Sequence, residues 1–351
     1  MTSNNHFISI IIPIYNGATW IENCFKSILK QTAIGVLKLE LCICDDCSTD
    51  NTPQLLSDWK STFEDAGVAL KVHRNADCTK GVGYAKNRAV KLSQGDFLCF
   101  QDIDDVMLPN RILRQYWRAL QEHSHTIVGS QFRRDPANST VRYTKWANNL
   151  TQEQLNLQVF TSHGPTVIMP TWFCNRRVFE RIGGFCECKK GCPEDLVFFN
   201  KHLNMGGQIS RVDEILLVYT YHTGQATFSV NEETIWNIRV QRLEQTILGK
   251  YIKFTIWNAG KQGRKFYNSL SEENRAKVVA FCDVDVNKIG KKYRSFDEHR
   301  RRFNNEVDII HFQKAVPPFI VCVKTDLTDG AFENNLQMLN LKEGDDYVMF
   351  S

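Results

Sequence analysis

Apolar and polar segments alternate over the first hundred residues in a way that is typical of an α/β protein. Residues 7–13 form a continuous, largely β-branched run, which indicates a strand buried on both faces. Residues 20–29 place apolar side chains on one face of a predicted helix. The pattern continues with strand 39–44, a helix after the polar segment 47–50, strand 68–72, helix 81–92 and strand 97–100. Strands and helices that alternate in this way favour a mostly parallel sheet.

A second α/β pattern begins near residue 254. Residues 254–257 and 277–282 are apolar runs separated by a glycine turn and a helix, and a strand over 318–323 and a terminal helix follow. Between the two patterns, residues 121–230 mix short strands with helices, and residues 232–250 are expected to form a connecting helix. We therefore predict a first domain over residues 1–250, divided near residue 120, and a small Rossmann-like α/β domain over residues 251–351.

Three polar clusters follow the predicted strands of the first domain. They are Pro13-Ile14-Tyr15-Asn16, Asp45-Asp46 and Asp102-Ile103-Asp104. Ligands of open α/β sheets bind beyond the carboxyl ends of the strands, so these clusters are expected to share one edge of the sheet. Ser48 or Asp50 is expected to cap the helix that follows the second cluster.

The acidic triplet is a candidate metal site. Asp102 and Asp104 are separated by one residue, so both carboxylates can point the same way from a strand end. Carboxylate oxygens suit hard divalent cations such as Mg²⁺ or Mn²⁺. Acidic turns after strands are common, however, and the triplet alone leaves an ordinary surface turn as the main alternative.

Composition narrows the class of protein only slightly. The chain has 351 residues, of which 42% are hydrophobic and 23% charged, and this argues against disorder. A net charge of +4 is compatible with a polyanionic partner but does not demand one. The first seven residues are polar, and no apolar run near them is long enough to span a membrane, so we expect a cytoplasmic protein.

The chain contains twelve cysteines, and several of them lie within apolar runs where a free thiol packs as a small hydrophobe. Cys186, Cys188 and Cys192 are different because they lie close together in a polar segment. Their spacing matches no standard zinc motif, so a zinc site is the minor interpretation of this group.

Taken together, the motifs resemble the family 2 inverting glycosyltransferases. The resemblance rests on residues 9–16, 45–50, 81–87 and 102–105 and continues through Gly183-Gly184-Phe185, Glu194-Asp195 and Tyr219–His222. It implies an A-type nucleotide-diphospho-sugar transferase domain that uses a divalent metal, Mn²⁺ or Mg²⁺. Residues 7–120 would then form the nucleotide-sugar half, and residues 121–230 the acceptor half.

The family resemblance also implies roles for individual side chains on the donor side. Pro13, Tyr15 and Asn16 would hold the uridine together with Asp45 or Asp46, with Tyr15 against the base. Asp102 and Ile103 would contact the nucleotide sugar, Asp104 would be the main metal ligand with Asp102 beside it, and His222 would be the third ligand. Lys86 stands where the family usually has arginine, so it keeps the charge near the phosphates without the two-pronged geometry.

On the acceptor side, the resemblance makes Asp195 the general base, with Glu194 orienting it or binding the acceptor. The alternative is that these two acids only complement the dipole of a helix that they open. Trp172 would stack on a sugar or a base, but packing in the core explains a tryptophan equally well.

Three longer stretches, residues 142–146, 160–174 and 254–264, resemble a tRNA-modifying branch of the family. That resemblance implies transfer of galactose from UDP-galactose to queuosine at the wobble position of tyrosine tRNA. A basic segment of the second domain is the candidate tRNA contact, and it contains Lys288, Lys291, Lys292, Arg294, Arg300, Arg301 and Arg302. A solvated surface loop is the alternative for this segment.

Two other functions stay open. The first is a β-1,3-transferase that uses UDP-N-acetylglucosamine on a glycan. The second is a catalytically lapsed module that binds RNA or a dinucleotide, because Asn258–Gly263 resembles a dinucleotide-binding turn and Asp283 follows at a suitable distance. Asparagine replaces the first glycine of that motif, which weakens the dinucleotide interpretation.

Overall fold

The structure is a computed structural model that describes residues 6–161, 164–188, 191–225, 229–297, 301–303 and 306–350, without the side chains of Arg302 and Asp326. The chain forms two compact units. The first contains the chain up to Asn156 and Gly164–Asn231, and the second contains a short segment that begins at Leu157 and the chain from Glu232 onward. In the described part of the chain, no helix is both long and apolar enough to cross a bilayer.

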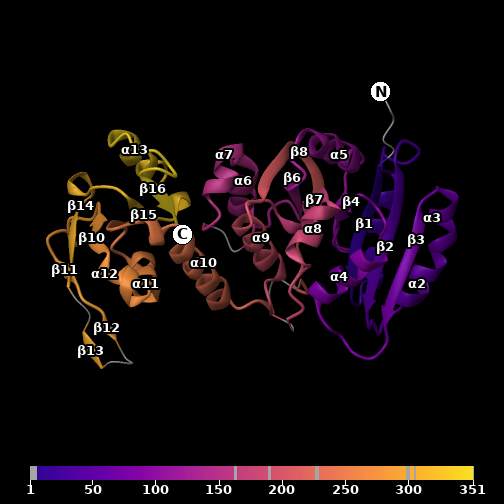
Figure 1. Cartoon of the computed structure of the whole chain (residues 1–351), viewed down its shortest axis with the longest axis horizontal. Helices are drawn as coiled ribbons and strands as arrows, with labels where there is room; N and C mark the ends of the chain where they lie inside the picture. The colour runs from indigo at the N-terminus through magenta and orange to yellow at the C-terminus, as the bar shows by residue number, and fades with distance from the viewer. Residues whose placement is uncertain are drawn as a thin grey trace. The chain divides into compact units, whose positions relative to one another are not determined.

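An eight-stranded mixed sheet forms the centre of the first unit, in the order β3-β2-β1-β4-β7-β6-β8-β5. Its parallel half, in which β1, β2 and β3 lie side by side (Figure 1), consists of β1 (Phe7–Ile14), β2 (Lys38–Asp46), β3 (Ala69–Asn75) and β4 (Phe97–Phe100). The other half consists of β7 (Phe173–Asn175), β6 (Thr126–Asp135), β8 (Gln208–Thr220) and β5 (Val106–Met107). The order of the parallel strands brings the carboxyl ends of β2, β1 and β4 next to one another.

Helices cover both faces of the parallel half, which explains why its strands are continuous apolar runs. Ile8, Ile10 and Ile12 belong to one buried cluster with side chains of α1 (Ala18–Leu29), α2 (Thr52–Asp58) and α3 (Lys60–Asp65). Ile11 is also fully buried but lies outside that cluster, and α4 (Val82–Leu92) packs on β1 and β2. The remaining helices of this unit are α5 (Arg111–Gln121), α6 (Val141–Asn149), α7 (Gln152–Leu157), α8 (Arg176–Ile182), α9 (Glu194–Asn204) and a 3-10 turn at Met169–Thr171.

The second unit contains a smaller sheet in the order β11-β14-β10-β9-β15-β16. Its parallel strands are β9 (Phe254–Trp257), β10 (Val278–Asp283), β14 (Val307–His311), β15 (Phe319–Val321) and β16 (Tyr347–Met349), with β11 (Lys292–Tyr293) antiparallel at one edge. In chain order these five parallel strands run 3-2-1-4-5, the order of a Rossmann-like sheet. The other elements are α10 (Glu232–Thr246), α11 (Lys261–Ser269), α12 (Glu272–Ala276), α13 (Ala331–Met338), the hairpin β12 (Phe296–Asp297) and β13 (Arg302–Phe303), and 3-10 turns at Leu248–Lys250, Phe312–Lys314 and Thr325–Leu327.

Three local features differ from the sequence-based expectations. The connecting helix α10 belongs to the second unit, because its buried side chains pack with that unit. The last strand, β16, was not expected, since three residues give too short an apolar pattern to separate a strand from a turn. The N-cap of α2 is Asn51 rather than Ser48 or Asp50; Ser48 and Asp50 instead hold the loop after β1.

Candidate active site

The loops that follow β1 and β2 are hydrogen-bonded to each other. Asn16 adopts a left-handed backbone conformation with φ 51°. Its backbone N–H donates to Ser48 Oγ at 2.8 Å, and its side-chain oxygen accepts from the Thr49 N–H at 2.8 Å. Asp50 accepts from the Ala18 N–H in the same way. These bonds fix the turn after Pro13 and leave Tyr15, which is 55% exposed, at the surface beside it.

The two acids at the end of β2 have different environments. Both carboxylate oxygens of Asp46 accept hydrogen bonds, from the backbone N–H groups of Lys80 and Gly81 and from the Asn75 amide. Asp45 accepts only from the Ser48 N–H, at 2.9 Å, while Arg74 Nε lies 3.5 Å from its second oxygen. Among the described residues, that second oxygen is buried and accepts no hydrogen bond. Asp45 therefore has one oxygen that takes part only in a long ion pair with Arg74, whereas both oxygens of Asp46 accept hydrogen bonds.

A buried arginine holds the turn that carries the acidic triplet. Arg111, which is fully buried in α5, donates to the Phe100 carbonyl at 2.7 Å, to the Pro170 carbonyl at 2.6 Å and to Gln101 Oε1 at 2.5 Å. Gln101 in turn donates to the carbonyls of Asp102 and Asp105 at 2.8 and 2.9 Å. The turn is thus held through its backbone, and its carboxylates are left for other partners.

The acidic turn and the end of β8 meet. Ligand atoms of Asp102, Asp104 and Asp105 lie within 4.8 Å of one another. His222 Nε2 is 2.9 Å from Asp104 Oδ2, and Asp105 accepts from the Thr220 N–H at 2.9 Å. The ring of Trp20 lies against the His222 imidazole with their centroids 4.8 Å apart. Three carboxylates in this arrangement fit the ligand preferences of Mg²⁺ and Mn²⁺, and the His222 imidazole lies beside them.

Mutual repulsion and burial perturb the acidic group. Burial, with the neighbouring carboxylates of Asp104, Glu194 and Asp195, raises the pKa of Asp102 to about 7, although Lys86 opposes this. Burial and the charges of Asp104 and Asp102 also raise the pKa of Asp105 well above its usual range. A divalent cation would relieve this repulsion, because it favours the ionised form of every carboxylate around it. Of the triplet, Ile103 contributes no ligand; its side chain is 9% exposed and packs in the core cluster.

Lys86 and Glu194 form a buried ion pair that joins α4 to the start of α9. Lys86 Nζ lies 2.8 Å from Glu194 Oε1, and the two side chains are 2% and 11% exposed. Burial acts to lower the pKa of Lys86, but the charges of Glu194 and Asp102 prevail and raise it. Lys86 is therefore a fixed cation between the acidic turn and the acids of α9. It does not point at solvent, as an unengaged phosphate ligand would.

Asp195 lies beside this pair and has the properties of a proton acceptor. Burial and the charge of Glu194 raise the pKa of Asp195 to about 6, while Lys86 limits the rise. One carboxylate oxygen accepts from the Leu196 N–H at 2.7 Å, which orients the group at the helix start. A carboxylate with a pKa near neutrality is a better general base than an ordinary one.

Trp172 is fully buried. Its indole is 1% exposed, donates to the Val167 carbonyl at 2.8 Å and packs among Phe185, Phe198 and Phe199. The indole has no exposed face that a sugar or base could stack on, so the burial favours the alternative interpretation, core packing.

Two of the basic residues expected to contact tRNA, Lys288 and Lys292, form ion pairs within the second unit. Lys288 lies 3.1 Å from Asp283 and 3.4 Å from Asp285, and Lys292 lies 3.3 Å from Glu306. Lys291, Arg294 and Arg301 are exposed. Arg300 lies outside the described residues, and the Arg302 side chain is not described.

The acid that follows the dinucleotide-like turn after β9 is also hydrogen-bonded within the second unit. Asp283, the acid expected to meet a ribose, accepts from the N–H groups of Ala259, Val284 and Asp285 and from Lys288 Nζ. These four bonds argue against a ribose contact, because no strong acceptor site on that carboxylate is left over.

Sequence reasoning missed three residues that shape the site: Arg74, Asp105 and Arg111. Asp105 was visible as the third acid of the turn, but its bond to Thr220 depends on β8. Arg111 gave no clear signal, since α5 contains three arginines and only the tertiary structure shows which of them is buried. Nothing in the sequence pairs Arg74 with Asp45, because that contact depends on the register of β2 with β3.

Comparisons with known proteins agree with this geometry. Residues 9–183 match the family described as glycosyl transferase family 2. A glycosyltransferase, GlyG, of Streptococcus pneumoniae is 25% identical over 154 residues, which cover 44% of this chain and 48% of that protein. A second relative is WfgD, a β-1,3-glucosyltransferase of Escherichia coli, which is 32% identical over 127 residues. These residues cover 36% of this chain and 46% of WfgD. The name of WfgD gives UDP-Glc as donor and α-D-GlcNAc-diphosphoundecaprenol as acceptor. The chain thus spans less than half of the length of these relatives.

Solved structures share the fold. TarS of S. aureus, residues 1–349 with UDP-GlcNAc, superposes with a TM-score of 0.51 at 20% identity and covers 76% of this chain and 71% of its own. A mannosyltransferase of Pyrobaculum calidifontis, solved with GDP-Man and Mn²⁺, gives a TM-score of 0.50 at 20% identity over 70% and 65% of the chains. The first unit therefore has the architecture of an A-type glycosyltransferase domain.

Proposed function

Because residues 9–183 match the family described as glycosyl transferase family 2, we propose that this protein is a nucleotide-sugar-dependent glycosyltransferase that transfers galactose from UDP-galactose to queuosine in tyrosine tRNA. One observation carries the catalytic part of the proposal. The acidic turn after β4 and the acids that open α9 lie on either side of one buried cation, Lys86. A donor held by the first group and an acceptor held by the second would meet there.

The donor would bind at the carboxyl ends of β1 and β2. Tyr15 is exposed beside a fixed turn and offers a ring face to the uracil, while Pro13 and Asn16 set the shape of that turn. The second oxygen of Asp45, which now faces Arg74, would accept the imide N–H of uracil. Asp46 would act indirectly, by holding the loop at Lys80 and Gly81.

Asp104, Asp102 and His222 would hold the divalent metal. When bound, such a cation neutralises charge that develops on a departing diphosphate. His222 is positioned by its 2.9 Å contact with Asp104, and Trp20 restricts its ring on the other side. Lys86 would supply a second positive charge close to Asp102, through the field at the site rather than by a direct phosphate contact.

Asp195 would accept the proton from the acceptor hydroxyl. As that proton moves to the carboxylate, the hydroxyl oxygen bonds to the anomeric carbon and the bond from that carbon to the UDP oxygen breaks. Glu194, held by Lys86, would orient the acceptor or the base. A single displacement of this kind inverts the anomeric carbon, so an α-linked donor gives a β-galactosyl product.

The tRNA part of the proposal rests on the resemblance of residues 142–146, 160–174 and 254–264 to the tRNA-modifying branch of the family. The exposed cations Lys291, Arg294 and Arg301 could neutralise phosphates. Lys288 and Lys292 would do so only after exchanging their present acidic partners. A tRNA acceptor of this kind would place the reaction in the cytoplasm.

Transfer to a glycan is the second candidate. It is supported by the relatives, because WfgD is named as a β-1,3-glucosyltransferase and a chondroitin synthase of Escherichia coli is 36% identical over 105 residues, which cover 30% of this chain and 14% of that protein. The donor site and base would be the same, with UDP-N-acetylglucosamine as the donor and a sugar hydroxyl as the acceptor.

One experiment separates the two candidates. The purified chain is incubated with Mn²⁺ and either UDP-galactose or UDP-N-acetylglucosamine, in the presence of queuosine-containing tRNA, queuosine-free tRNA or a set of oligosaccharides. The tRNA proposal requires a hexosylated queuosine nucleoside from UDP-galactose alone and none with Asp195→Asn. Product on an oligosaccharide, with none on either tRNA, would refute the tRNA proposal and favour the glycan.

A further inference from the structure

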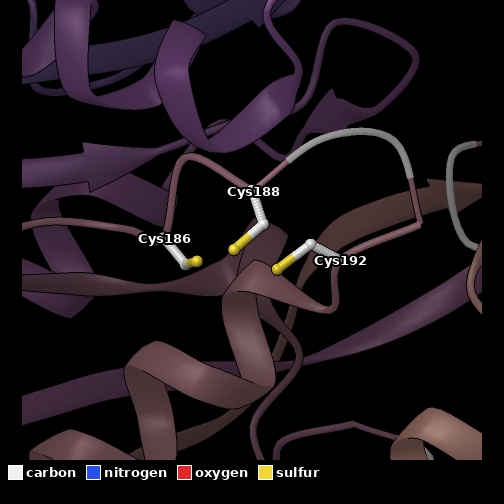
Figure 2. A group of neighbouring side chains, drawn as sticks. All are labelled: Cys186, Cys188 and Cys192. Atoms are coloured by element: carbon white, nitrogen blue, oxygen red, sulfur yellow. The ribbon is translucent and has the colours of Figure 1, made fainter.

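Three cysteine thiols converge in the segment between α8 and α9. Ligand atoms of Cys186, Cys188 and Cys192 all lie within 4.8 Å of one another, although up to five residues separate them in the chain. Figure 2 shows their sulfur atoms directed toward one another, with Cys192 just before α9. All three are free thiols rather than halves of a disulfide.

The distances fit a thiolate-bound metal. A tetrahedral zinc ion with sulfur at about 2.3 Å places its ligand sulfurs roughly 3.8 Å apart. The present spacing of the three sulfurs, all within 4.8 Å of one another, is compatible with that arrangement. Among the described residues, no fourth His, Cys, Asp or Glu belongs to this group, so the fourth position would be open to water.

The backbone at Phe185 and Cys186, beside the first of the three thiols, is held against α4. A Cβ at Gly83 would lie 2.1 Å from the Cys186 carbonyl oxygen, which means that only glycine allows the segment to approach this closely. Asn87 accepts from the Phe185 N–H at 2.8 Å and donates to the Phe185 carbonyl at 2.9 Å. The Asn87 amide also donates to Glu187, which keeps that carboxylate engaged with α4.

We propose that Cys186, Cys188 and Cys192 bind a thiophilic divalent cation, with zinc as the expected ion. Binding displaces the three thiol protons and involves no change of oxidation state. Since Cys192 lies two residues before Glu194, the ion would tie the start of α9 to the segment that rests on α4. Its role would be structural, fixing the place where Glu194 and Asp195 enter the site.

This site would be distinct from the acidic group after β4 and does not depend on the proposed transfer reaction. Thiolates are soft ligands that select zinc, whereas the carboxylates of Asp102 and Asp104 suit Mg²⁺ or Mn²⁺. The protein would therefore hold a tightly bound structural ion and an exchangeable one. A negative transferase assay would not contradict the zinc proposal, and absence of zinc would not contradict the proposed transfer reaction.

The test measures metal content and coordination of the whole chain, purified under reducing conditions. We expect one zinc per chain that survives dialysis, and replacement by Co²⁺ should produce an intense thiolate-to-cobalt charge-transfer band. Cys188→Ser and Cys192→Ser should lower zinc affinity by tenfold or more, while Cys78→Ser, at an exposed cysteine outside the group, should retain it. Cys188 is exposed, so its replacement should leave the fold intact, which thermal melting would verify.

Two results would overturn the proposal. One is a reduced wild-type chain that contains no zinc and gives no thiolate band with Co²⁺. The other is metal binding that is unchanged in both serine variants. Mass spectrometry of the non-reduced chain adds a separate check, because a disulfide among these cysteines together with absent metal would assign the group to redox chemistry instead. Hydrogen exchange at residues 191–195 should slow when zinc is added to the stripped chain, and it should not respond in Cys188→Ser.

Discussion

The Lys86–Glu194 pair offers the sharpest test of how the site is built. Replacing Lys86 with methionine keeps the length and apolar stem of the side chain and removes only the cation. Both side chains are almost fully buried, at 2% and 11% exposed, so little solvent can screen the carboxylate that is left behind. The neighbouring carboxylates of Asp102 and Asp195 lose the same cation.

Removing one partner of a buried pair costs about 3–5 kcal/mol of unfolding free energy, whereas removing both can be close to neutral. We therefore expect Lys86→Met to lose about 3–5 kcal/mol of unfolding free energy at pH 8. The double variant Lys86→Met/Glu194→Gln should lose clearly less than the sum of the two single variants. At lower pH the loss in Lys86→Met should shrink, because the orphaned carboxylates become protonated.

The measurement is urea unfolding of the four proteins of this double-mutant cycle at pH 8 and pH 5.5, in buffer without divalent cations. Lys26→Met serves as the matched control, since it removes a cation from an exposed pair with Glu22 and should leave the midpoint unchanged. Additive losses, or a Lys86→Met protein as stable as the wild type at pH 8, would refute the idea that this pair holds α4 and α9 together.

Three further predictions test the base, the metal ligand and the contact of α4. The pKa of Asp195 is raised to about 6, so kcat/KM of the wild type should fall as pH drops through about 6, where the base becomes protonated. In the same pH–rate series, Asp195→Asn should lose about 10²–10⁴-fold above pH 6 and less below it, and a wild-type profile that stays flat down to pH 5 would exclude this base. His222→Ala should raise the Mn²⁺ concentration needed for half-maximal activity by about tenfold or more, with partial recovery at saturating metal, and an unchanged metal titration would remove it from the ligand set. Gly83→Ala should destabilise the protein by about 1–3 kcal/mol in thermal or urea melts because its Cβ would meet the Cys186 carbonyl at 2.1 Å, whereas Gly164→Ala, which has open space around it, should behave as wild type.

The local strands and the family motifs were readable from the sequence. Strand β4 at Phe97–Phe100 and strand β9 at Phe254–Trp257 coincide with the apolar runs that predicted them. This agreement has a physical cause, since parallel strands buried on both faces must be apolar throughout and the chain must turn polar where they end. The same rule placed Tyr15, Asp45 and Asp102 at neighbouring strand ends before any contact was known.

The sequence could not show which partner each charged side chain has. Lys86 and Glu194 are 108 positions apart, and Asp104 and His222 are 118 apart, so only the packing of α4 on α9 and of β8 beside β5 brings them together. The burial of Trp172 and the hydrogen bonds of the Asp46 carboxylate also depend on tertiary structure, because their partners come from other segments of the chain.

The cysteine group shows the same division. Its spacing matches no standard zinc motif, and on sequence alone a zinc site was the minor interpretation. The structure places the three sulfurs within 4.8 Å of one another, and Gly83 and Asn87 of α4 hold the backbone at Phe185 and Cys186, beside the first of them. Local apolar pattern thus determined the strands and where they end, while long-range packing alone decided which polar groups face one another. The reason is that burial acts on each segment independently, whereas charge pairing and metal coordination require groups from several segments at once.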